Sequence, residues 1–97
     1  MPIIMVMEWS GVTRAQYEQV RNELDWVTHK PAGGRLHAAG FTDDGLRVVD
    51  IWDSAEAFGR FAEEKLQRAT RSAGITTAPK VSMFPAAYLD LLAYREA

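Results

Sequence analysis

A tight turn, Thr42-Asp-Asp-Gly45, separates two short apolar segments near the middle of this chain of 97 residues. The dipeptide Asp-Gly is a strong hairpin signal, because both residues tolerate the positive φ angles that the tightest turns require. Residues 46–52 are rich in β-branched side chains, which favour strands, and residues 35–41 precede the turn as a second strand. The sequence therefore predicts an antiparallel β-hairpin around which the other segments must pack.

A helix is predicted on each side of this hairpin. Upstream, Thr13 and Gln16 have the spacing of a capping box. The helix predicted over residues 13–26 then carries one apolar stripe, made of Tyr17, Val20, Leu24 and Val27. Downstream, Asp53 and Ser54 offer N-cap oxygens for a second helix. Its apolar stripe consists of Ala57, Phe58, Phe61, Ala62, Leu66 and Ala69.

Two further strands, over residues 3–9 and 80–84, complete the order β-α-β-β-α-β. This order is typical of the ferredoxin-like α+β fold, a four-stranded antiparallel sheet with both helices on one face. We expect residues 1–85 to form this domain. Residues 86–97 form a C-terminal tail with a weak helical pattern of Tyr88, Leu91, Leu92 and Tyr94.

The second face of such a sheet has no helices to cover it. An apolar face of this size is a large exposed patch for a small monomer. We therefore expect a homodimer in which two sheets pack face to face about a two-fold axis, forming a dimeric α+β barrel. The apolar tail, with Tyr88, Leu89, Leu91 and Leu92, is expected to contact the partner subunit.

Composition excludes several classes of protein. The formal net charge of −2 argues against binding nucleic acid, and the absence of cysteine excludes disulfides and thiolate metal sites. No apolar run is long enough to span a bilayer, and the N-terminal segment lacks the pattern of a signal peptide. We expect a cytoplasmic protein that binds neither membranes nor metals, since its two histidines have no metal-ligand spacing.

The hairpin sorts its side chains between the two faces of the sheet. With an even loop, one face carries Arg35, His37, Ala39, Phe41, Leu46, Val48, Asp50 and Trp52. The other face is small and aliphatic in the middle of the strands, so we expect it to pack against the helices. A four-residue loop places His37 opposite Asp50, whereas a two-residue Asp44-Gly45 loop places it opposite Trp52.

Histidine is the natural general base near neutral pH. His37 is the candidate base and Asp50 the partner that orients it, while Trp52 and Phe41 are expected to line a pocket. Tyr17 or Arg35 is a candidate hydrogen-bond donor to an oxyanion. The alternative interpretation is structural, with His37 satisfied by Asp50 at the dimer interface and Trp52 anchoring the core.

The run Pro31-Ala-Gly-Gly-Arg-Leu-His-Ala-Ala-Gly-Phe41 and the segment from Gly45 to Phe58, with its Asp50-Ile-Trp-Asp-Ser54 junction, resemble small actinobacterial proteins. These belong to the antibiotic biosynthesis monooxygenase-like branch of the dimeric α+β barrel superfamily. The resemblance covers about residues 3–84. It implies a dimer with a cavity in each subunit. Members of the superfamily include cofactor-independent anthrone oxygenases, polyketide cyclases, lactone isomerases and haem-degrading enzymes.

The resemblance leaves the activity open. It favours cofactor-independent, base-initiated oxygenation or cyclisation of a hydrophobic aromatic or polyketide-like substrate. The alternatives are a non-catalytic ligand-binding or accessory dimer and a purely structural dimerisation domain. No cofactor is expected, because Gly33-Gly34 lacks a phosphate-loop pattern and the second helix offers Phe58 and Phe61 but no histidine or tryptophan for haem.

Overall fold

The computed structural model describes residues 1–92. Its strands and helices follow in the predicted order: β1 (Ile3–Ser10), α1 (Arg14–Leu24), β2 (Gly34–Thr42), β3 (Gly45–Trp52), α2 (Ala55–Phe61), the π-helical segment η1 (Ala62–Leu66), α3 (Gln67–Ser72) and β4 (Lys80–Pro85). Helices α2 and α3 are joined by η1 into one continuous helix.

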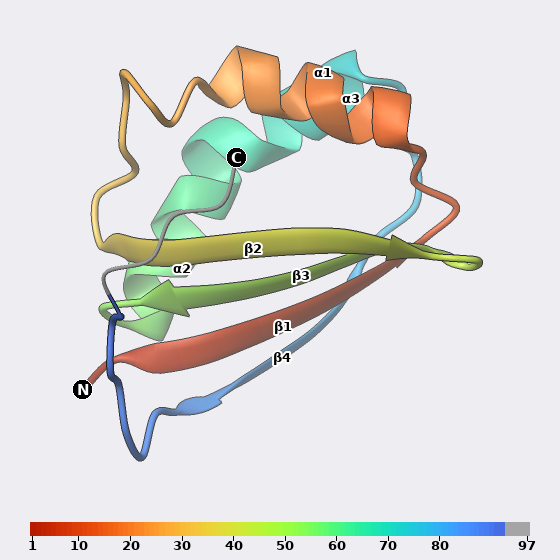
Figure 1. Cartoon of the computed structure of the whole chain (residues 1–97). Helices are drawn as coiled ribbons and strands as arrows, with labels where there is room; N and C mark the ends of the chain where they lie inside the picture. Colours follow the sequence, from red (N-terminus) through yellow and green to blue (C-terminus); the bar gives the residue numbers. More distant parts are fainter. Residues whose placement is uncertain (93–97) are drawn as a thin grey trace.

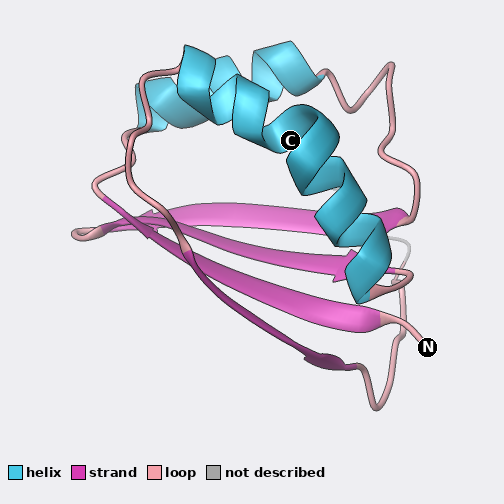
Figure 2. Ribbon diagram, turned by 180° about the vertical axis from the view of Figure 1, so that it is seen from behind, coloured by secondary structure: helices cyan, strands magenta, loops and turns pink. Residues whose placement is uncertain are grey.

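The strands form one antiparallel sheet in the order β2-β3-β1-β4. Both helical segments lie on the same side of this sheet, and no helix of residues 1–92 covers the opposite side (Figures 1 and 2). This arrangement is the ferredoxin-like α+β fold, so the predicted fold class is confirmed. Within residues 1–92, no helix has the length and apolar character needed to cross a membrane.

The register of the hairpin places His37 directly opposite Asp50. This is the pairing expected for the four-residue loop. Each strand nevertheless extends one residue further than predicted, since Thr42 pairs with Gly45. A Cβ atom at Gly45 would lie 2.4 Å from the carbonyl oxygen of Trp9, so the backbones approach closely here. At the far end of the hairpin, a bulge between Gly34 and Leu36 interrupts the ladder.

The prediction of which hairpin face meets the helices is wrong. The face that carries His37 lies under the helices, and its side chains on β3 are buried: Leu46, Val48, Asp50 and Trp52. The aliphatic face points away from them, with Leu36 39% and Val49 42% exposed. Large side chains, such as Trp52 and Met5, fill the layer between sheet and helices. The helices therefore pack on large side chains, and a face of small side chains, which would let the helices approach the sheet closely, is not required.

Helix α1 begins as predicted and ends earlier. The hydroxyl of Thr13 accepts a hydrogen bond from the backbone N–H of Gln16, and the Gln16 side chain accepts one from the backbone N–H of Thr13. Asp25 then adopts a left-handed conformation with φ 47° and ends the helix after Leu24. Val27 is consequently exposed, and Trp26 packs against the core in its place.

The second helix begins after its predicted N-cap, Ser54, whose hydroxyl accepts from the backbone N–H of Ala57. The sequence analysis did not anticipate η1, in which the helix widens to π geometry. Gly74 follows the end of α3 with φ 77°, the usual conformation of a residue just beyond a helix.

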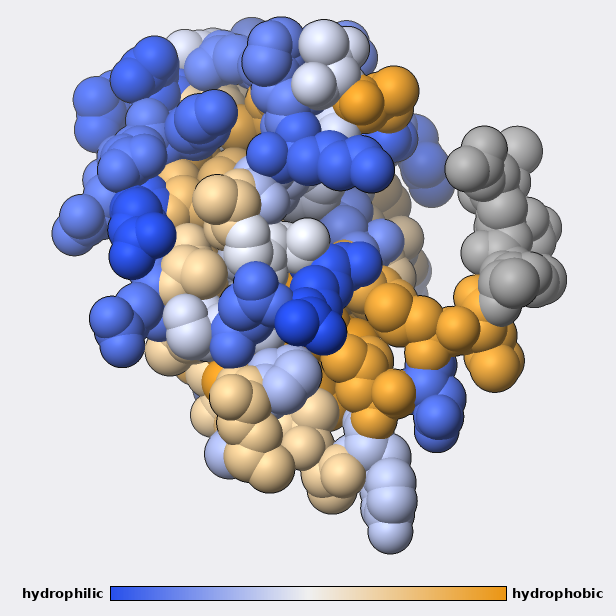
Figure 3. Space-filling model, turned by 90° about the vertical axis from the view of Figure 1, so that its left-hand side faces the viewer, coloured by the Kyte–Doolittle hydropathy of each residue, from blue (hydrophilic) through white to orange (hydrophobic). Residues whose placement is uncertain are grey.

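The chain after Pro85 is not helical where the structure describes it, so the weak helical pattern is wrong for residues 86–92. Tyr94 lies outside the described residues. The tail is tied to the N-terminal end by a hydrogen bond from the backbone N–H of Ala86 to the carbonyl oxygen of Pro2. Beyond that point Tyr88 is 88% and Leu92 80% exposed. Figure 3 shows hydrophobic atoms gathered on this flank, next to the last described residues.

Candidate active site

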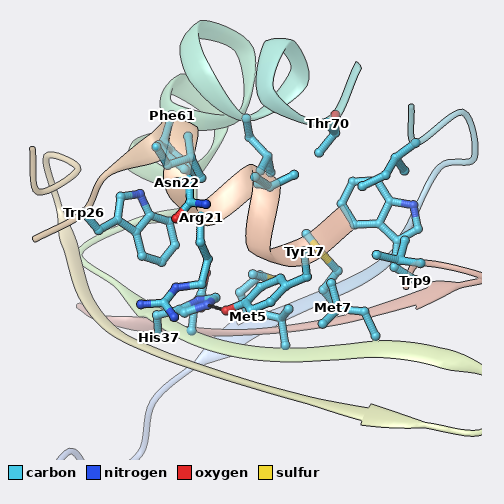
Figure 4. A pocket seen from close by; sticks show the side chains of 18 of the residues that line it. Met5, Met7, Trp9, Tyr17, Arg21, Asn22, Trp26, His37, Phe61 and Thr70 are labelled. Carbon is cyan, nitrogen blue, oxygen red and sulfur yellow. Dashed lines mark hydrogen bonds and ion pairs between the residues drawn. The ribbon is translucent and has the colours of Figure 1, made fainter. Parts of the chain in front are cut away.

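A cavity of about 250 Å³ lies between the sheet and the helices. Its walls are mainly apolar, with Met5 and Met7 from β1, Val20 from α1 and Phe61 from α2 among the lining side chains (Figure 4). The volume is just below the roughly 300–1,000 Å³ typical of ligand pockets. Such a cavity suits a compact hydrophobic ligand better than an extended chain.

Three polar side chains form a hydrogen-bonded chain at this cavity. Oδ1 of Asp50 lies 2.7 Å from Nδ1 of His37, and Nε2 of His37 lies 2.6 Å from the hydroxyl of Tyr17. The indole N–H of Trp52 donates to the other Asp50 oxygen over 3.1 Å. Figure 4 shows the rings of Tyr17 and His37 next to each other beneath α1. The chain connects a buried carboxylate to a phenol that lines the cavity.

The carboxylate of Asp50 fixes the direction of the first hydrogen bond, and the direction of the second follows for a neutral His37 ring. A carboxylate only accepts, so Nδ1 of His37 carries the proton that Asp50 receives. Nε2 of the neutral ring is then an acceptor, and the hydroxyl of Tyr17 donates to it. The phenol oxygen retains lone pairs for a further partner. The Tyr17 oxygen is therefore placed to accept a proton while passing its own to His37.

The fold sets this geometry from three separate elements. The hairpin register puts His37 beside Asp50, and α1 crosses the sheet so that Tyr17 reaches the same point. Phe41 packs edge-on against Tyr17, with ring centroids 5.8 Å apart, and Arg14 stacks over the Phe41 ring. These contacts hold the phenol against the sheet.

The surroundings of Tyr17 favour its neutral form. Burial raises the pKa of the Tyr17 phenol above its ordinary value of 10.0. The positive charge of Arg21 opposes this shift in part, and the negative charges of Asp50 and Glu18 add to it. Tyr17 thus holds its proton at neutral pH and remains available as a donor to His37.

Trp26 is a cavity residue that the sequence analysis missed. Its indole meets the His37 ring edge-on, with centroids 4.5 Å apart, and packs against Phe61 at 5.6 Å. Among residues 1–92, Nε1 of Trp26 is the buried side-chain nitrogen or oxygen that has no hydrogen-bond partner. Leaving such a donor unpaired costs about 1–3 kcal/mol. Because Trp26 lies beyond the end of α1, helical periodicity gave no signal for it.

The other predicted site residues lie around the hydrogen-bonded chain in different positions. Neither Trp52 nor Phe41 is among the residues that line the cavity, contrary to the expectation. Trp52 is buried and donates to Asp50, and Phe41 packs edge-on against Tyr17. Arg35 is not part of the site, because the bulge turns it toward Asp53, with which it forms an exposed ion pair. Arg21 and Asn22, which the sequence analysis did not single out, are exposed side chains on the cavity wall.

The described residues contain no group of three or more histidine, aspartate or glutamate side chains that could hold a metal ion. The donor set at the cavity, one histidine and one carboxylate already bonded to each other, also offers no metal an open position. The Tyr17–His37–Asp50 chain can supply acid–base chemistry at the wall of an apolar cavity.

No family model matches the chain, and no curated protein matches it significantly. Several solved structures share its fold. SnoaB, a cofactor-independent oxygenase from Streptomyces nogalater, is 16% identical, with a TM-score of 0.65 over 91% of this chain and 95% of that one. NE2512, a protein of unknown function from Nitrosomonas europaea, is 13% identical, with a TM-score of 0.68 over 95% and 94%.

A dimeric ferredoxin-like protein of unknown function from Thermobifida fusca is also similar, at 18% identity and a TM-score of 0.59, over 89% of this chain and 92% of that one. These identities are low, so the likeness concerns the fold. The chain also shares its fold with proteins described as putative antibiotic biosynthesis monooxygenases from Deinococcus radiodurans and Caulobacter crescentus, at 17% and 13% identity.

Proposed function

We propose that this protein carries out base-initiated chemistry, without a cofactor, on a compact hydrophobic substrate that contains a carbonyl group. The observation that carries the proposal is the Tyr17–His37–Asp50 hydrogen-bonded chain at the wall of an apolar cavity. An aromatic or polyketide-like ketone fits both the apolar lining and the need for an acidic C–H bond next to a carbonyl.

The first step is a proton transfer through two residues. The oxygen of Tyr17 takes the proton of the substrate C–H, while the phenol proton moves to Nε2 of His37. The C–H electron pair stays on the substrate as an enolate. The imidazolium is stabilised by the Asp50 carboxylate, which is itself held by the indole of Trp52. General-base catalysis of this kind contributes about 10²–10⁴-fold to a rate.

The enolate has two productive fates. In oxygenation it donates electrons to dioxygen, so that a methylene becomes a carbonyl with one oxygen atom while the other leaves as water. In cyclisation it attacks a second carbonyl of the same molecule, forms a C–C bond, and the resulting alkoxide takes a proton back from the residues. The likeness to SnoaB, a cofactor-independent oxygenase, supports oxygenation.

Oxygen consumption with anthrone as the probe tests this proposal. The purified protein, treated with a chelator, is mixed with anthrone in air-saturated buffer, and oxygen uptake and anthraquinone are followed against a protein-free blank. Oxygenation is supported if one dioxygen is consumed per anthraquinone formed, at a rate above that of the blank. The Tyr17→Phe variant should then lose this excess rate. Rates equal to the blank contradict it.

One observation favours a second function, ligand binding without turnover. Nε2 of His37 is already bonded to the Tyr17 hydroxyl and Nδ1 to Asp50, so neither ring nitrogen is free to take a proton from a ligand. A binding protein would use the same apolar chamber, with the polar residues as fixed recognition groups. Saturable binding of anthrone with neither oxygen uptake nor deuterium exchange at its methylene would identify this function.

We also propose that two copies pack sheet against sheet. The face opposite the helices is apolar and open, with Leu36, Val49 and Phe84 each 39–46% exposed. One structural neighbour is described as a dimeric ferredoxin-like protein, which supports this assembly. In the same proposal the exposed side chains of the tail, among them Tyr88 and Leu92, contact the partner subunit.

A further inference from the structure

The cavity between the sheet and the helices opens at the end of α1. Of the side chains that line it, the exposed ones are Arg21, Asn22 and Val27, and the others are buried or half-buried. The opposite end of the cavity is closed by Trp9, which is 6% exposed and donates its indole N–H to the carbonyl oxygen of Thr77 (Figure 4). Arg21, Asn22 and Val27 thus form the mouth through which a ligand enters.

Arg21 brings a positive charge to this mouth. Asp25, one turn further along the chain, pairs with His29 instead, over 3.5 Å. The other ion pairs in residues 1–92 involve neither Arg21 nor Glu18, which lies one turn before it. Figure 4 shows the Arg21 side chain extending from α1 toward the sheet. Its charge reaches Tyr17, where it opposes the rise of the phenol pKa. An unpaired guanidinium therefore lies at the mouth, close to the proposed base.

The cavity and its mouth together select a ligand with two unlike parts. The interior is lined mainly by apolar side chains, such as Met5, Val20 and Phe61. A guanidinium keeps its charge throughout the physiological pH range and binds a carboxylate through two parallel N–H···O hydrogen bonds. The amide of Asn22, exposed beside Arg21, adds further N–H donors at the mouth. The matching ligand has a hydrophobic body and a carboxylate at one end.

The charges at the mouth favour a ligand with one negative charge over a ligand with two. Among the described side chains that line the cavity, Arg21 is the only arginine or lysine, and Asp25 supplies a negative charge near it. A dianion such as a phosphate monoester would pair one charge with Arg21 and bring the other toward Asp25, where the two repel. A single carboxylate avoids this repulsion.

We infer that Arg21 is a specificity-determining residue that binds the carboxylate of a hydrophobic acid at the mouth, with the hydrocarbon part of the ligand inside the cavity. The inference deepens the proposed function, on which it rests for the direction of the reacting C–H toward Tyr17. It adds an anionic group to the substrate. It also predicts that removal of one exposed charge changes which ligands bind while the cavity itself stays intact.

The test compares two probes of similar shape that differ in charge, 2-naphthoate and 2-naphthamide. Calorimetry measures the affinity of the purified protein for each probe, at low and at high concentrations of sodium chloride. We expect naphthoate to bind roughly three- to tenfold more tightly at low salt, the upper range for an exposed ion pair with bidentate geometry. This preference should shrink at high salt, because dissolved ions screen charges at the surface.

Arg21→Gln removes the charge and keeps a flexible polar side chain. We expect its affinities for the two probes to agree within about twofold, and its affinity for naphthamide to equal that of the wild type. Arg21→Lys keeps the charge without the planar fork and should retain part of the preference. The matched control is Arg60→Gln, which removes the same charge from an exposed position on α2 that does not line the cavity, and it should retain the full preference.

Four results would overturn the inference. These are equal affinity of the wild type for the two probes, binding of neither probe, a preference that survives in Arg21→Gln, and a loss in Arg60→Gln as large as that in Arg21→Gln. The outcome is separable from the proposed function. Preference for naphthoate with no oxidation of anthrone contradicts the proposed oxygenation and leaves the role of Arg21 intact. Oxidation of anthrone by a protein that binds both naphthalene probes equally contradicts the role of Arg21 alone.

Discussion

The hydroxyl of Tyr17 lies 2.6 Å from Nε2 of His37, and both side chains line the cavity. This contact changes the chemistry expected of the histidine. With Nδ1 bound to Asp50, both ring nitrogens are engaged. In the proposed mechanism the phenol therefore takes the proton from the substrate, and His37 receives the proton of the phenol.

Tyr17→Phe tests this contact with the smallest possible change. The variant keeps the ring that packs against Phe41 and removes the hydroxyl. We expect oxidation of anthrone to fall by about 10²–10⁴-fold, the range of general-base catalysis, because the path for the proton is lost. Stability should fall by only about 1 kcal/mol, the net value of one hydrogen bond. Oxygen uptake and urea denaturation measure the two effects.

A variant with nearly full turnover would show that His37 takes the proton directly. The variant separates direct proton transfer to His37 from a relay through Tyr17, because loss of the hydroxyl leaves Nε2 of His37 free to accept a proton. Turnover above that of the wild type would make the hydroxyl an obstruction rather than a relay.

Alkaline pH offers a test that needs no substrate. Because burial raises the pKa of Tyr17 above 10.0, folding favours the neutral phenol. This contribution to stability is fully present below the pKa of the unfolded chain and is lost as the pH rises through the higher pKa of the folded state. The stability difference between the wild type and Tyr17→Phe should therefore shrink above about pH 10. Urea denaturation of both proteins from neutral to alkaline pH measures it, and a constant difference would contradict the shift.

Asp50→Asn is expected to damage both stability and turnover. The carboxylate accepts from His37 and Trp52 and is 3% exposed, so an amide leaves one of these donors facing an NH₂ group. We expect a loss of about 1.5–3 kcal/mol, as for buried hydrogen bonds to charged groups. Turnover should fall by about 10²-fold or more, since an amide that donates to Nδ1 reverses the direction of the proton path.

The matched control for this variant is Asp53→Asn. Asp53 is an exposed carboxylate three positions along the chain, and it pairs with Arg35 at the surface. Its amide should change stability by less than about 1 kcal/mol, the usual value of an exposed ion pair. Equal losses of stability in Asp50→Asn and Asp53→Asn would show that the buried contacts of Asp50 contribute no more than an exposed ion pair.

The sequence restricted the hairpin register to two alternatives, because side chains alternate strictly along a strand and an even loop keeps the two sets on one face. The structure has the register in which His37 lies opposite Asp50. Pairing Phe41 with Leu46 forces His37 opposite Asp50, whatever the rest of the chain does. The face that meets the helices was not predictable in this way. Both faces of the hairpin contain apolar residues, and the choice depends on the large side chains of β1, such as Met5 and Met7, that share the covered side.

The contacts of Tyr17 and Trp26 depend on tertiary structure, which explains why the sequence left them open. Tyr17 is twenty positions before His37, and only the crossing of α1 over the sheet joins them. Trp26 leaves the helical phase because Asp25 takes the left-handed conformation, a choice that no neighbouring glycine signals. The π-helical segment η1 likewise has no composition that distinguishes it from an α-helix.

Phe61→Ala tests the assignment of the covered face. Phe61 is 7% exposed and packs between Trp26 and Trp52, at centroid distances of 5.6 and 5.2 Å. Removal of a buried phenylalanine ring costs about 3–5 kcal/mol, a large share of the stability of a small domain. We expect a matching fall in the free energy of unfolding, measured with urea. An unchanged value would mean that the helix does not pack on the sheet through this residue.

The assembly is tested by one charge placed on the open face of the sheet. Val49 is 42% exposed at the centre of that face, between Ala38 on β2 and Val6 on β1. In a sheet-to-sheet dimer, Val49→Glu buries two carboxylates without partners close to the two-fold axis, and we expect it to shift the protein to monomers. Light scattering should then give the 10.9 kDa of one chain, against twice that mass for the wild type.

The control variant is Ala15→Glu, on the exposed side of α1. It adds the same charge away from the sheet and should leave the dimer intact. A wild-type protein that is monomeric at tens of micromolar, or a Val49→Glu variant that remains dimeric, would show that this face is not the interface.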